Sequence, residues 1–274
     1  ALLENIRRWY NGYRFSDIDT TVYNPFSVLL FFSKKKFDNY WFETGTPTFL
    51  IDLIRRNDYD LRLIHEEVLS SRGFNSYEID NIPIIPVLFN TGYLTISQVE
   101  QPDITQTDYM LNYPNNEVRI SFLEQFIDSA FTRGTNARSY ARKLTKSIRA
   151  DNLEQVIAII KTFFAEMPYD LKSVNCHSEA YYQSLVYCIF KLVGYDTSAE
   201  ERTNKGRIDL VVEGNQSIYL FEMKVDKPAQ EAIEQIKSRG YADKYRLSNK
   251  KLTLVGLSFS RAERNVADYA VEEI

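Results

Sequence analysis

Two apolar segments, residues 208–212 and 218–225, flank a turn signal at residues 213–216, which read Glu-Gly-Asn-Gln. Apolar strands joined by such a turn are typical of a β-hairpin. A two-residue loop at residues 215–216 would fix the register of this hairpin. The loop therefore decides which polar side chains face one another across the two strands.

In that register Asp209 stands directly opposite Glu222, and a loop shifted to residues 214–215 leaves the two one diagonal step apart. Because side chains alternate along a strand, Glu222 and Lys224 share one face and their apolar neighbours take the other. We expect two carboxylates and an ammonium at one end of a sheet whose reverse face is apolar. A lone Glu-x-Lys is more typical of an exposed strand with a structural role. The presence of Asp209 at hairpin spacing favours a catalytic site instead.

Two helices that flank the hairpin add polar residues to this group. A helix predicted over residues 178–193 carries Glu179 on its apolar face, where an acid needs a partner. Capping of the helix N-terminus would also favour an acid there. The helix that begins at Pro228 carries Gln235 at the edge of its apolar face, within reach of the sheet edge. A polar residue at that boundary is equally compatible with no special role.

Hard oxygen ligands in this arrangement suit Mg²⁺, which prefers one or two carboxylates with waters completing its octahedron. A bound metal lowers the pKa of a coordinated water and neutralises charge that grows on a phosphate. A neighbouring lysine can orient that water or stabilise the charge. We expect Asp209 and Glu222 to hold the metal and Lys224 to lie beside the attacking water. Glu179 would bind the metal directly or through water.

Composition excludes several classes of protein. The 274 residues are 44% hydrophobic and 26% charged, as in soluble globular proteins, and no apolar run reaches the roughly 20 residues of a membrane span. The chain opens at Ala1 without a signal-peptide pattern, so we expect a cytoplasmic protein and a fragment of something longer. The two cysteines form no Cys-x-x-Cys, and a structural zinc site is not expected.

The net charge of −4 argues against a generally basic nucleic-acid surface. Residues 133–149, however, contain several basic residues and no acid. This local charge could follow a phosphate backbone, and Arg138, Arg142 and Lys146 are its candidate contacts. A solvated helix face is the alternative interpretation. Arg207, on the same face as the motif aspartate two positions later, could contact a phosphate or form a salt bridge with Glu222.

Apolar periodicity predicts the remaining elements. Helices are expected at residues 24–32 and 48–56 and in two stretches between residues 121 and 164. Residues 84–88 fit a helix or a strand that leads into a short hairpin at residues 90–96, and residues 101–108 fit a polar loop. From Ser178 onward the order is helix, strands, helix and a last buried strand at residues 252–259. That order favours an α/β fold, with a mixed sheet flanked by helices.

The run Gly206-Arg207-Ile208-Asp209, then Glu222-Met223-Lys224, then Gln235 in the next helix resembles the PD-(D/E)XK nuclease superfamily over residues 170–274. Residues 200–245 most resemble a prokaryotic branch that is fused to an AAA-ATPase-like domain. The resemblance implies a restriction-endonuclease-like fold. It also implies Asp209 as the motif aspartate, Glu222 and Lys224 as the E-x-K, Glu179 as the first-helix acid and Gln235 as the family glutamine. Ile208 replaces the proline of the superfamily name, which is a common substitution.

The front of the chain agrees with that branch. The segments WYNGYRF, VYNPFSVLLFF and YWFETGTPTFLIDLIRR resemble the C-terminal part of the ATPase-like domain. None of the ten glycines precedes a lysine, so the chain has no G-x-x-x-x-G-K-[ST] and no ATP site is expected in it. We expect a mainly helical α+β domain over residues 1–120, a helical connector over 121–170 and a nuclease-like domain over 171–274.

These patterns predict a Mg²⁺- or Mn²⁺-dependent nuclease that hydrolyses phosphodiester bonds, with DNA as the expected substrate, within a larger ATPase-nuclease protein. One alternative is a non-cleaving nucleic-acid-binding or assembly module that keeps the nuclease fold, and the basic run favours it. Another is a structural protein-interaction domain, which the net negative charge allows. No membrane partner is expected, and a homo-oligomer is compatible with the sequence.

Overall fold

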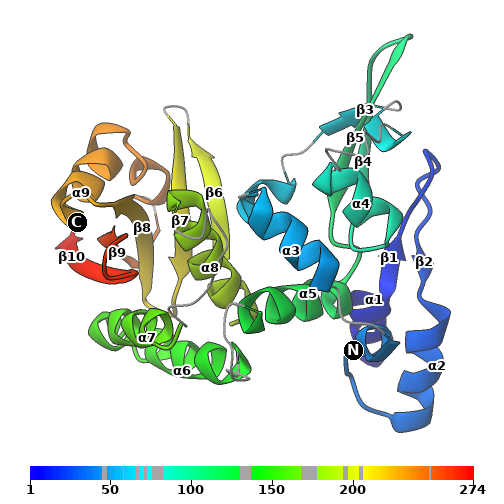
Figure 1. The fold of residues 1–274 in the computed structure, drawn as a ribbon, viewed down its shortest axis with the longest axis horizontal. Helices are drawn as coiled ribbons and strands as arrows, with labels where there is room; N and C mark the ends of the chain where they lie inside the picture. Colours follow the sequence, from blue (N-terminus) through cyan, green and yellow to red (C-terminus); the bar gives the residue numbers. More distant parts are fainter. Residues whose placement is uncertain are drawn as a thin grey trace. The chain divides into compact units, whose positions relative to one another are not determined.

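The computed structural model describes residues 1–44, 48–57, 59–65, 68–70, 73–75, 83–129, 137–167, 178–193, 197–203, 206–246 and 248–274. It describes the side chains of these residues except at positions 43–44, 65, 75, 197–203 and 206–207. The chain divides into two compact units (Figure 1). One comprises Ala1–Ile54 and Leu63–Gln125, and the other comprises Arg55–Arg62 and Phe126–Ile274.

The first part of the chain combines helices with small antiparallel sheets. Its helices are α1 (Leu2–Tyr10), α2 (Pro25–Lys34), α3 (Thr48–Arg56), α4 (Ile84–Asn90) and α5 (Asn116–Asp128). Strands β1 (Asn11–Tyr13) and β2 (Val22–Tyr23) form a pair. Strands β3 (Val68–Ser70), β5 (Gln106–Asn112) and β4 (Thr95–Asp103) form a three-stranded sheet in that order. Helices α2 and α3 confirm the predicted helical segments.

Helix α2 begins where the sequence predicts, for a local reason. The side chain of Asn24 accepts hydrogen bonds from the backbone N–H groups of Phe26 and Ser27, at 3.1 and 3.4 Å. Proline at the first helical position needs no such partner, since it has no N–H. Asparagine caps followed by proline are therefore strong start signals. The apolar residues of α2 then pack on α1, with Tyr10 and Phe31 in one buried cluster.

Residues 101–108 are strand rather than the expected loop. Strands β4 and β5 pair as far as Asp103 and Gln106, so that only residues 104–105 remain as the turn. Most side chains of this distal part are exposed, and an exposed two-stranded ribbon does not require apolar alternation. Residues 84–88 belong to helix α4, and the hairpin is formed by β4 and β5 rather than by residues 90–96.

The second part of the chain holds an α/β fold. Its helices are α6 (Ala137–Arg149), α7 (Leu153–Ala165), α8 (Glu179–Leu192) and α9 (Ala229–Ser238). Its strands are β6 (Thr197–Thr203), β7 (Gly206–Glu213), β8 (Ser217–Val225), β9 (Lys251–Ser260) and β10 (Asn265–Glu273). They form one sheet in the order β10-β9-β8-β7-β6, in which β8 and β9 are parallel and the other neighbours antiparallel. This confirms the predicted mixed sheet flanked by helices.

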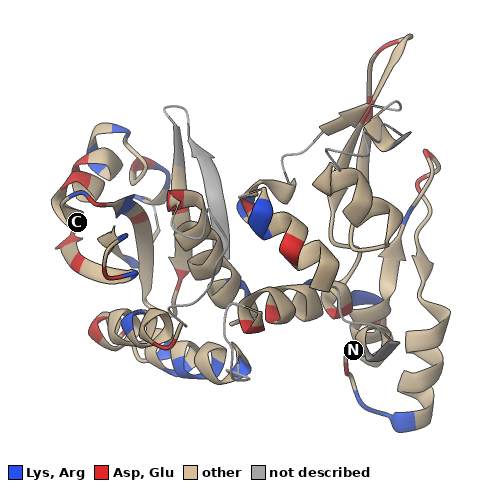
Figure 2. Cartoon of the chain, in the orientation of Figure 1, with Lys and Arg blue, Asp and Glu red and all other residues tan. Residues whose placement is uncertain are grey.

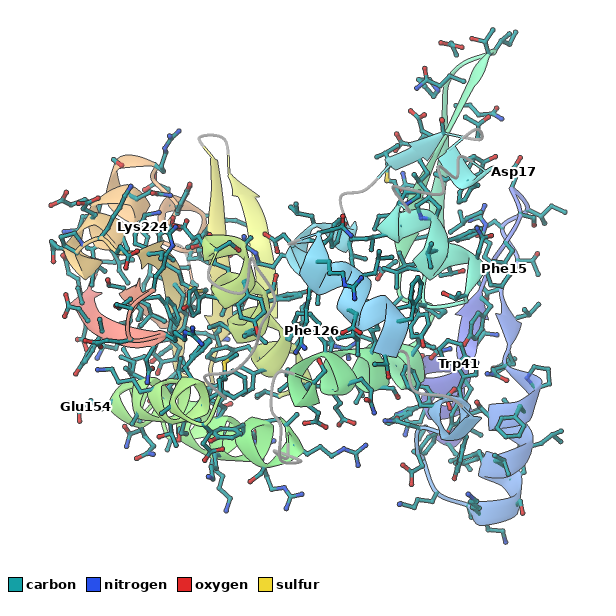
Figure 3. The ribbon with its side chains drawn as sticks, viewed as in Figure 1. Phe15, Asp17, Trp41, Phe126, Glu154 and Lys224 are labelled. Atoms are coloured by element: carbon teal, nitrogen blue, oxygen red, sulfur yellow. The ribbon has the colours of Figure 1, made fainter. Side chains whose placement is uncertain are left out.

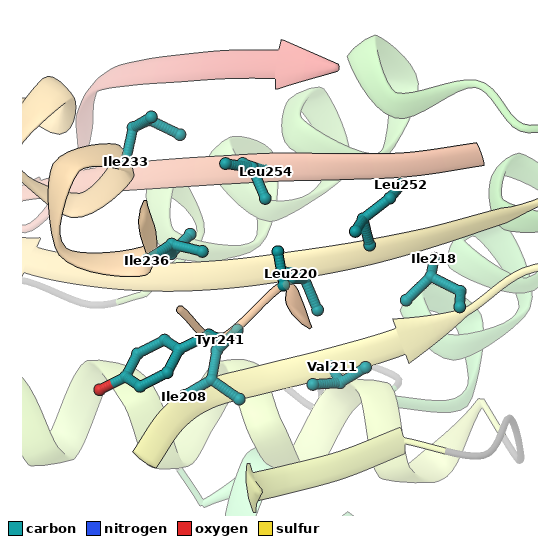
Figure 4. Packing of buried hydrophobic residues seen from close by; sticks show 10 residues of the cluster. Ile208, Val211, Ile218, Leu220, Ile233, Ile236, Tyr241, Leu252 and Leu254 are labelled. Atoms are coloured by element: carbon teal, nitrogen blue, oxygen red, sulfur yellow. The ribbon is translucent and has the colours of Figure 1, made fainter. Parts of the chain in front are cut away.

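Helices cover both faces of this sheet, so the central strand β8 is buried along almost its whole length. On one face Ile233 of α9 and Leu220 of β8 belong to one apolar cluster (Figure 4). On the other face Phe190 of α8 contacts Phe221, with ring centroids 5.6 Å apart. The last residues of β8, 222–225, therefore lie largely inside the protein. A charged side chain among them needs a partner.

The β7–β8 hairpin has the register that the sequence predicts. Leu210 pairs with Phe221 and Glu213 with Ile218, and the N–H of Gly214 donates to the carbonyl of Ser217 at 2.8 Å. The loop is therefore residues 215–216. The two edge strands, β6 and β10, were not predicted.

None of the helices in the described ranges combines the length and the apolar character that crossing a bilayer requires. The described cysteine, Cys188, is buried in α8 as a free thiol. Cys176 lies outside the described residues.

Candidate active site

The predicted carboxylates meet where the hairpin opens. Regular pairing between β7 and β8 stops at Leu210 and Phe221, one position before Asp209 and Glu222. There the backbone N–H of Met223 donates to Oδ2 of Asp209 at 2.7 Å. The carboxylate of Asp209 thus accepts a hydrogen bond from a backbone N–H that a carbonyl of the neighbouring strand would accept in a regular sheet. At this point, next to Glu222, a side chain and not a backbone carbonyl links the two strands.

Glu222 is almost fully buried, with 1% of its surface exposed. Its Oε1 accepts hydrogen bonds from Nζ of Lys224 at 3.2 Å and from Nε2 of Gln235 on α9. Its Oε2 is buried without a hydrogen-bond partner among the described residues. Burial, and then the charge of Asp209, raise the pKa of Glu222 to about 8, although Lys224 opposes the shift. An unpartnered buried carboxylate oxygen is costly, so this atom suits a cation.

Lys224 projects from the end of β8 (Figure 3), with 12% of its side chain exposed. Burial lowers the pKa of its ammonium, but the carboxylates of Glu222, Glu179 and Asp209 together outweigh burial and raise the pKa above its usual value. Lys224 is therefore a cation at neutral pH. It can stabilise negative charge, and it cannot act as a general base in that state.

Helix α8 brings two more polar groups to the site. Ser178 caps the helix, since its hydroxyl accepts from the N–H of Tyr181 at 3.0 Å, and Glu179 follows in the first turn. One turn later, Nε2 of the buried Gln183 donates to Oδ2 of Asp209 at 2.9 Å and lies 3.4 Å from Oε1 of Glu179. The charge of Glu179 contributes to the raised pKa of Asp209. Glu179 and Gln235 thus both lie at the site where the sequence placed them.

Arg62 also lies at this site, and sequence reasoning missed it. Its Nη1 donates to Oδ1 of Asp209 at 3.2 Å, and Asp209 is 13% exposed. Burial raises the pKa of Asp209, and the charge of Arg62 is the largest opposing effect. The two residues stand 147 positions apart. No local pattern around Arg62 indicates its partner, because only the fold brings the two segments together.

A metal ion is compatible with these residues. Among the described side chains, no group of three His, Cys, Asp or Glu is gathered so that it could hold a metal ion by itself. Mg²⁺, however, commonly uses one or two carboxylates and keeps several waters. Asp209 and Glu222, with the unpartnered Oε2 of Glu222, meet that need. That Glu179 binds the metal, directly or through water, stays a prediction.

The basic residues of the predicted nucleic-acid surface lie on α6, which Figure 2 shows with Lys and Arg along it. Arg138, Arg142 and Lys146 are exposed, while Leu144 and Ile148 are buried against the unit's core. The three cations are four residues apart in sequence and therefore share one helix face. Arg133 and the side chain of Arg207 lie outside the described residues.

Glu222 should make the stability of the metal-free protein depend on pH. Its pKa is about 8 in the folded protein against 4.5 for an ordinary glutamate, so the folded state holds a proton that the unfolded chain releases between these values. Stability should then fall as pH rises from about 4.5 to about 8, by at most about 1.4 kcal/mol per pH unit. Glu222→Gln lacks this proton, so its stability relative to the wild type should rise across that window.

Urea unfolding of both proteins in chelator, at about pH 5, 6.5 and 8, measures this difference. A difference in the free energy of unfolding that does not change with pH would contradict the raised pKa of Glu222.

Comparison with known proteins adds an independent observation. Residues 177–269 match the model of a family described as the PD-(D/E)XK nuclease superfamily. The matched range includes α8, the β7–β8 hairpin and α9, and with them Glu179, Asp209, Glu222, Lys224 and Gln235. It does not include Arg62.

The chain is also similar to a protein of Azotobacter chroococcum mcd 1 that is described as "Uncharacterized protein in vnfD 5'region". The two are 37% identical over 275 residues, which is 99% of this chain and 53% of the relative. The chain thus spans about half the length of this curated relative.

Proposed function

We propose that this protein is a metal-dependent nuclease of the PD-(D/E)XK type that hydrolyses phosphodiester bonds, with DNA as its substrate. The observation that carries the proposal is the group of Asp209, Lys224 and the buried Glu222, in which Oε2 of Glu222 has no partner among the described residues. The match of residues 177–269 to the nuclease family supports it.

Each residue has a distinct task in this proposal. Asp209 and Glu222 would hold Mg²⁺ or Mn²⁺, which when bound would activate a water and neutralise charge on the phosphate. Lys224 is held in place by Glu222 at 3.2 Å and stabilises the negative charge that develops during hydrolysis. Gln235 donates to the same oxygen, Oε1, of Glu222. Together these two donors leave Oε2 as the atom that faces a cation.

The proposal also concerns a longer protein of which this chain would be a part. The first part of the chain resembles the C-terminal part of an AAA-ATPase-like domain, and the curated relative is about twice as long as this chain. We infer that the nuclease works within a larger ATPase-nuclease protein, and that this chain carries the cleaving part.

Cleavage assays test the proposed function. Supercoiled plasmid and end-labelled single- and double-stranded DNA and RNA would be incubated with the protein in Mg²⁺, in Mn²⁺ or in chelator. Wild type should cut DNA only with metal, and Glu222→Gln should lose this activity, because its neutral amide is a poor metal ligand. Glu234→Gln is the matched control: it makes the same change on the exposed face of α9 and should cut like wild type.

Equal product from wild type and Glu222→Gln would refute the nuclease proposal. RNA cleavage in place of DNA cleavage would keep the reaction and correct the substrate.

A second candidate function is a nucleic-acid-binding module that does not cut, and the exposed cations of α6 favour it. It predicts binding that survives Glu222→Gln and weakens when Arg138, Arg142 and Lys146 are all changed to Gln. For each phosphate that the variant no longer neutralises, the slope of log K against log salt should become shallower by about 0.9. Gel-shift titrations of the same variants at several salt concentrations separate this function from cleavage.

A further inference from the structure

Arg62 contacts the candidate active site from a segment far outside the family match. Its guanidinium is buried, with 5% of the side chain exposed. Nη1 donates to Oδ1 of Asp209 at 3.2 Å, and Nη2 donates to Oε1 of Gln183 at 2.6 Å. Gln183 in turn donates to Oδ2 of Asp209 at 2.9 Å. One cation therefore acts on both oxygens of the Asp209 carboxylate, on one directly and on the other through Gln183.

Asp60 holds this guanidinium in place. Nε of Arg62 donates to both carboxylate oxygens of Asp60, at 2.9 and 3.0 Å. Asp60 also accepts from the hydroxyl of Ser184 on α8 at 3.1 Å, and that hydroxyl accepts from the N–H of Leu61 at 3.2 Å. The segment is thus fastened to the helix that carries Gln183. Paired contacts between a guanidinium and a carboxylate fix orientation as well as charge.

We propose that Arg62 is a positioning residue of the nuclease site, which orients the Asp209 carboxylate and the Gln183 amide for metal binding. The inference rests on the proposed function. Oε1 of Gln183 has to face Arg62, because the reversed amide would set its N–H groups against those of the guanidinium. That constraint turns Nε2 of Gln183 toward Asp209. Without Arg62, both the amide and the carboxylate could adopt other orientations.

The geometry favours this role over direct competition with the metal. A carboxylate oxygen carries two lone pairs, so Oδ1 of Asp209 can accept from Arg62 and still bind a cation. Carboxylates that bind metals are commonly held by such hydrogen bonds, and removal of the holding group typically weakens metal binding about 10- to 100-fold. If Arg62 instead occupied the place of the metal, its removal would strengthen binding, so the sign of the effect separates the two roles.

Mn²⁺ titration calorimetry on the whole chain tests the proposal, together with cleavage rates at saturating Mn²⁺. Arg62→Met should weaken Mn²⁺ binding about 10- to 100-fold. Arg62→Lys should have an intermediate effect, because an ammonium keeps the charge and lacks the planar fork. Arg56→Met is the matched control: it removes the same kind of charge from the exposed end of α3 and should leave the affinity unchanged.

Native affinity in Arg62→Met would overturn the proposal, and tighter binding would overturn it in favour of competition. Urea unfolding in chelator shows which variants fold. If Arg62→Met does not fold, Arg62→Lys decides, and native affinity in that variant would overturn the proposal. A wild-type protein that binds Mn²⁺ in an Arg62-dependent manner but cuts nothing would refute the nuclease function alone. A wild type that binds no Mn²⁺ would refute both.

Discussion

Lys224→Met is expected to reduce cleavage about 10²- to 10³-fold at saturating metal, which is the usual effect of removing one group that stabilises charge in a transition state. The ammonium is held 3.2 Å from Oε1 of Glu222 and is kept protonated by the surrounding carboxylates. Methionine fills the same space without charge. The measurement is the single-turnover cleavage rate of labelled DNA, with Mn²⁺ raised until the rate no longer increases.

Saturating metal matters because Lys224 also opposes the raised pKa of Glu222. Without Lys224, Glu222 keeps its proton to higher pH and binds metal less readily, and excess metal removes that contribution. Lys227→Met changes the same residue type three positions later, where the side chain is exposed, and should cut at the wild-type rate. A Lys224→Met protein that cuts as fast as this control would show that the ammonium has no part in the chemistry.

The register of the β7–β8 hairpin was predictable because local residues determine it. The loop at residues 215–216 joins two apolar strands, and the pairs from Glu213–Ile218 to Leu210–Phe221 follow from it. The starts of α8 and α9 were predictable for the same reason, since a serine cap and a proline mark them. The edge strands β6 and β10 were not predictable. Residues 197–203 lack apolar alternation, and most side chains of β10 are exposed, so neither pattern indicates a strand.

The contacts of the candidate site also fall into those that the sequence could predict and those that it could not. Glu222 and Lys224 share a strand, and the hairpin register brings Asp209 to them, so one short stretch of sequence was enough to predict their meeting. The bond from the N–H of Met223 to Asp209 was not predictable, because it depends on where the ladder ends. Arg62 was not predictable either, because tertiary structure alone carries residues 60–62 to α8.

Gly256→Val is expected to destabilise the protein by about 3 kcal/mol or more, at the upper end of the usual cost of overpacking. Gly256 lies on β9 beside Glu222 of β8. A Cβ atom there would stand 2.3 Å from the carbonyl oxygen of Ala229 and 3.1 Å from Cβ of Ala232. The first contact is with backbone, which no side-chain rotation can relieve. Helix α9 would have to move away from the sheet.

A shift of α9 should also disturb the candidate active site, because α9 carries Gln235, whose amide donates to Glu222. Glycine inside a strand often marks such a close approach of another backbone. Gly256→Ala should show a smaller loss in the same direction. Gly214→Ala is the matched control, since the nearest atom to its Cβ would be 3.2 Å away and its backbone is not left-handed. Urea unfolding measures all three, and equal midpoints for Gly256→Ala and Gly214→Ala would mean that α9 does not depend on glycine at this position.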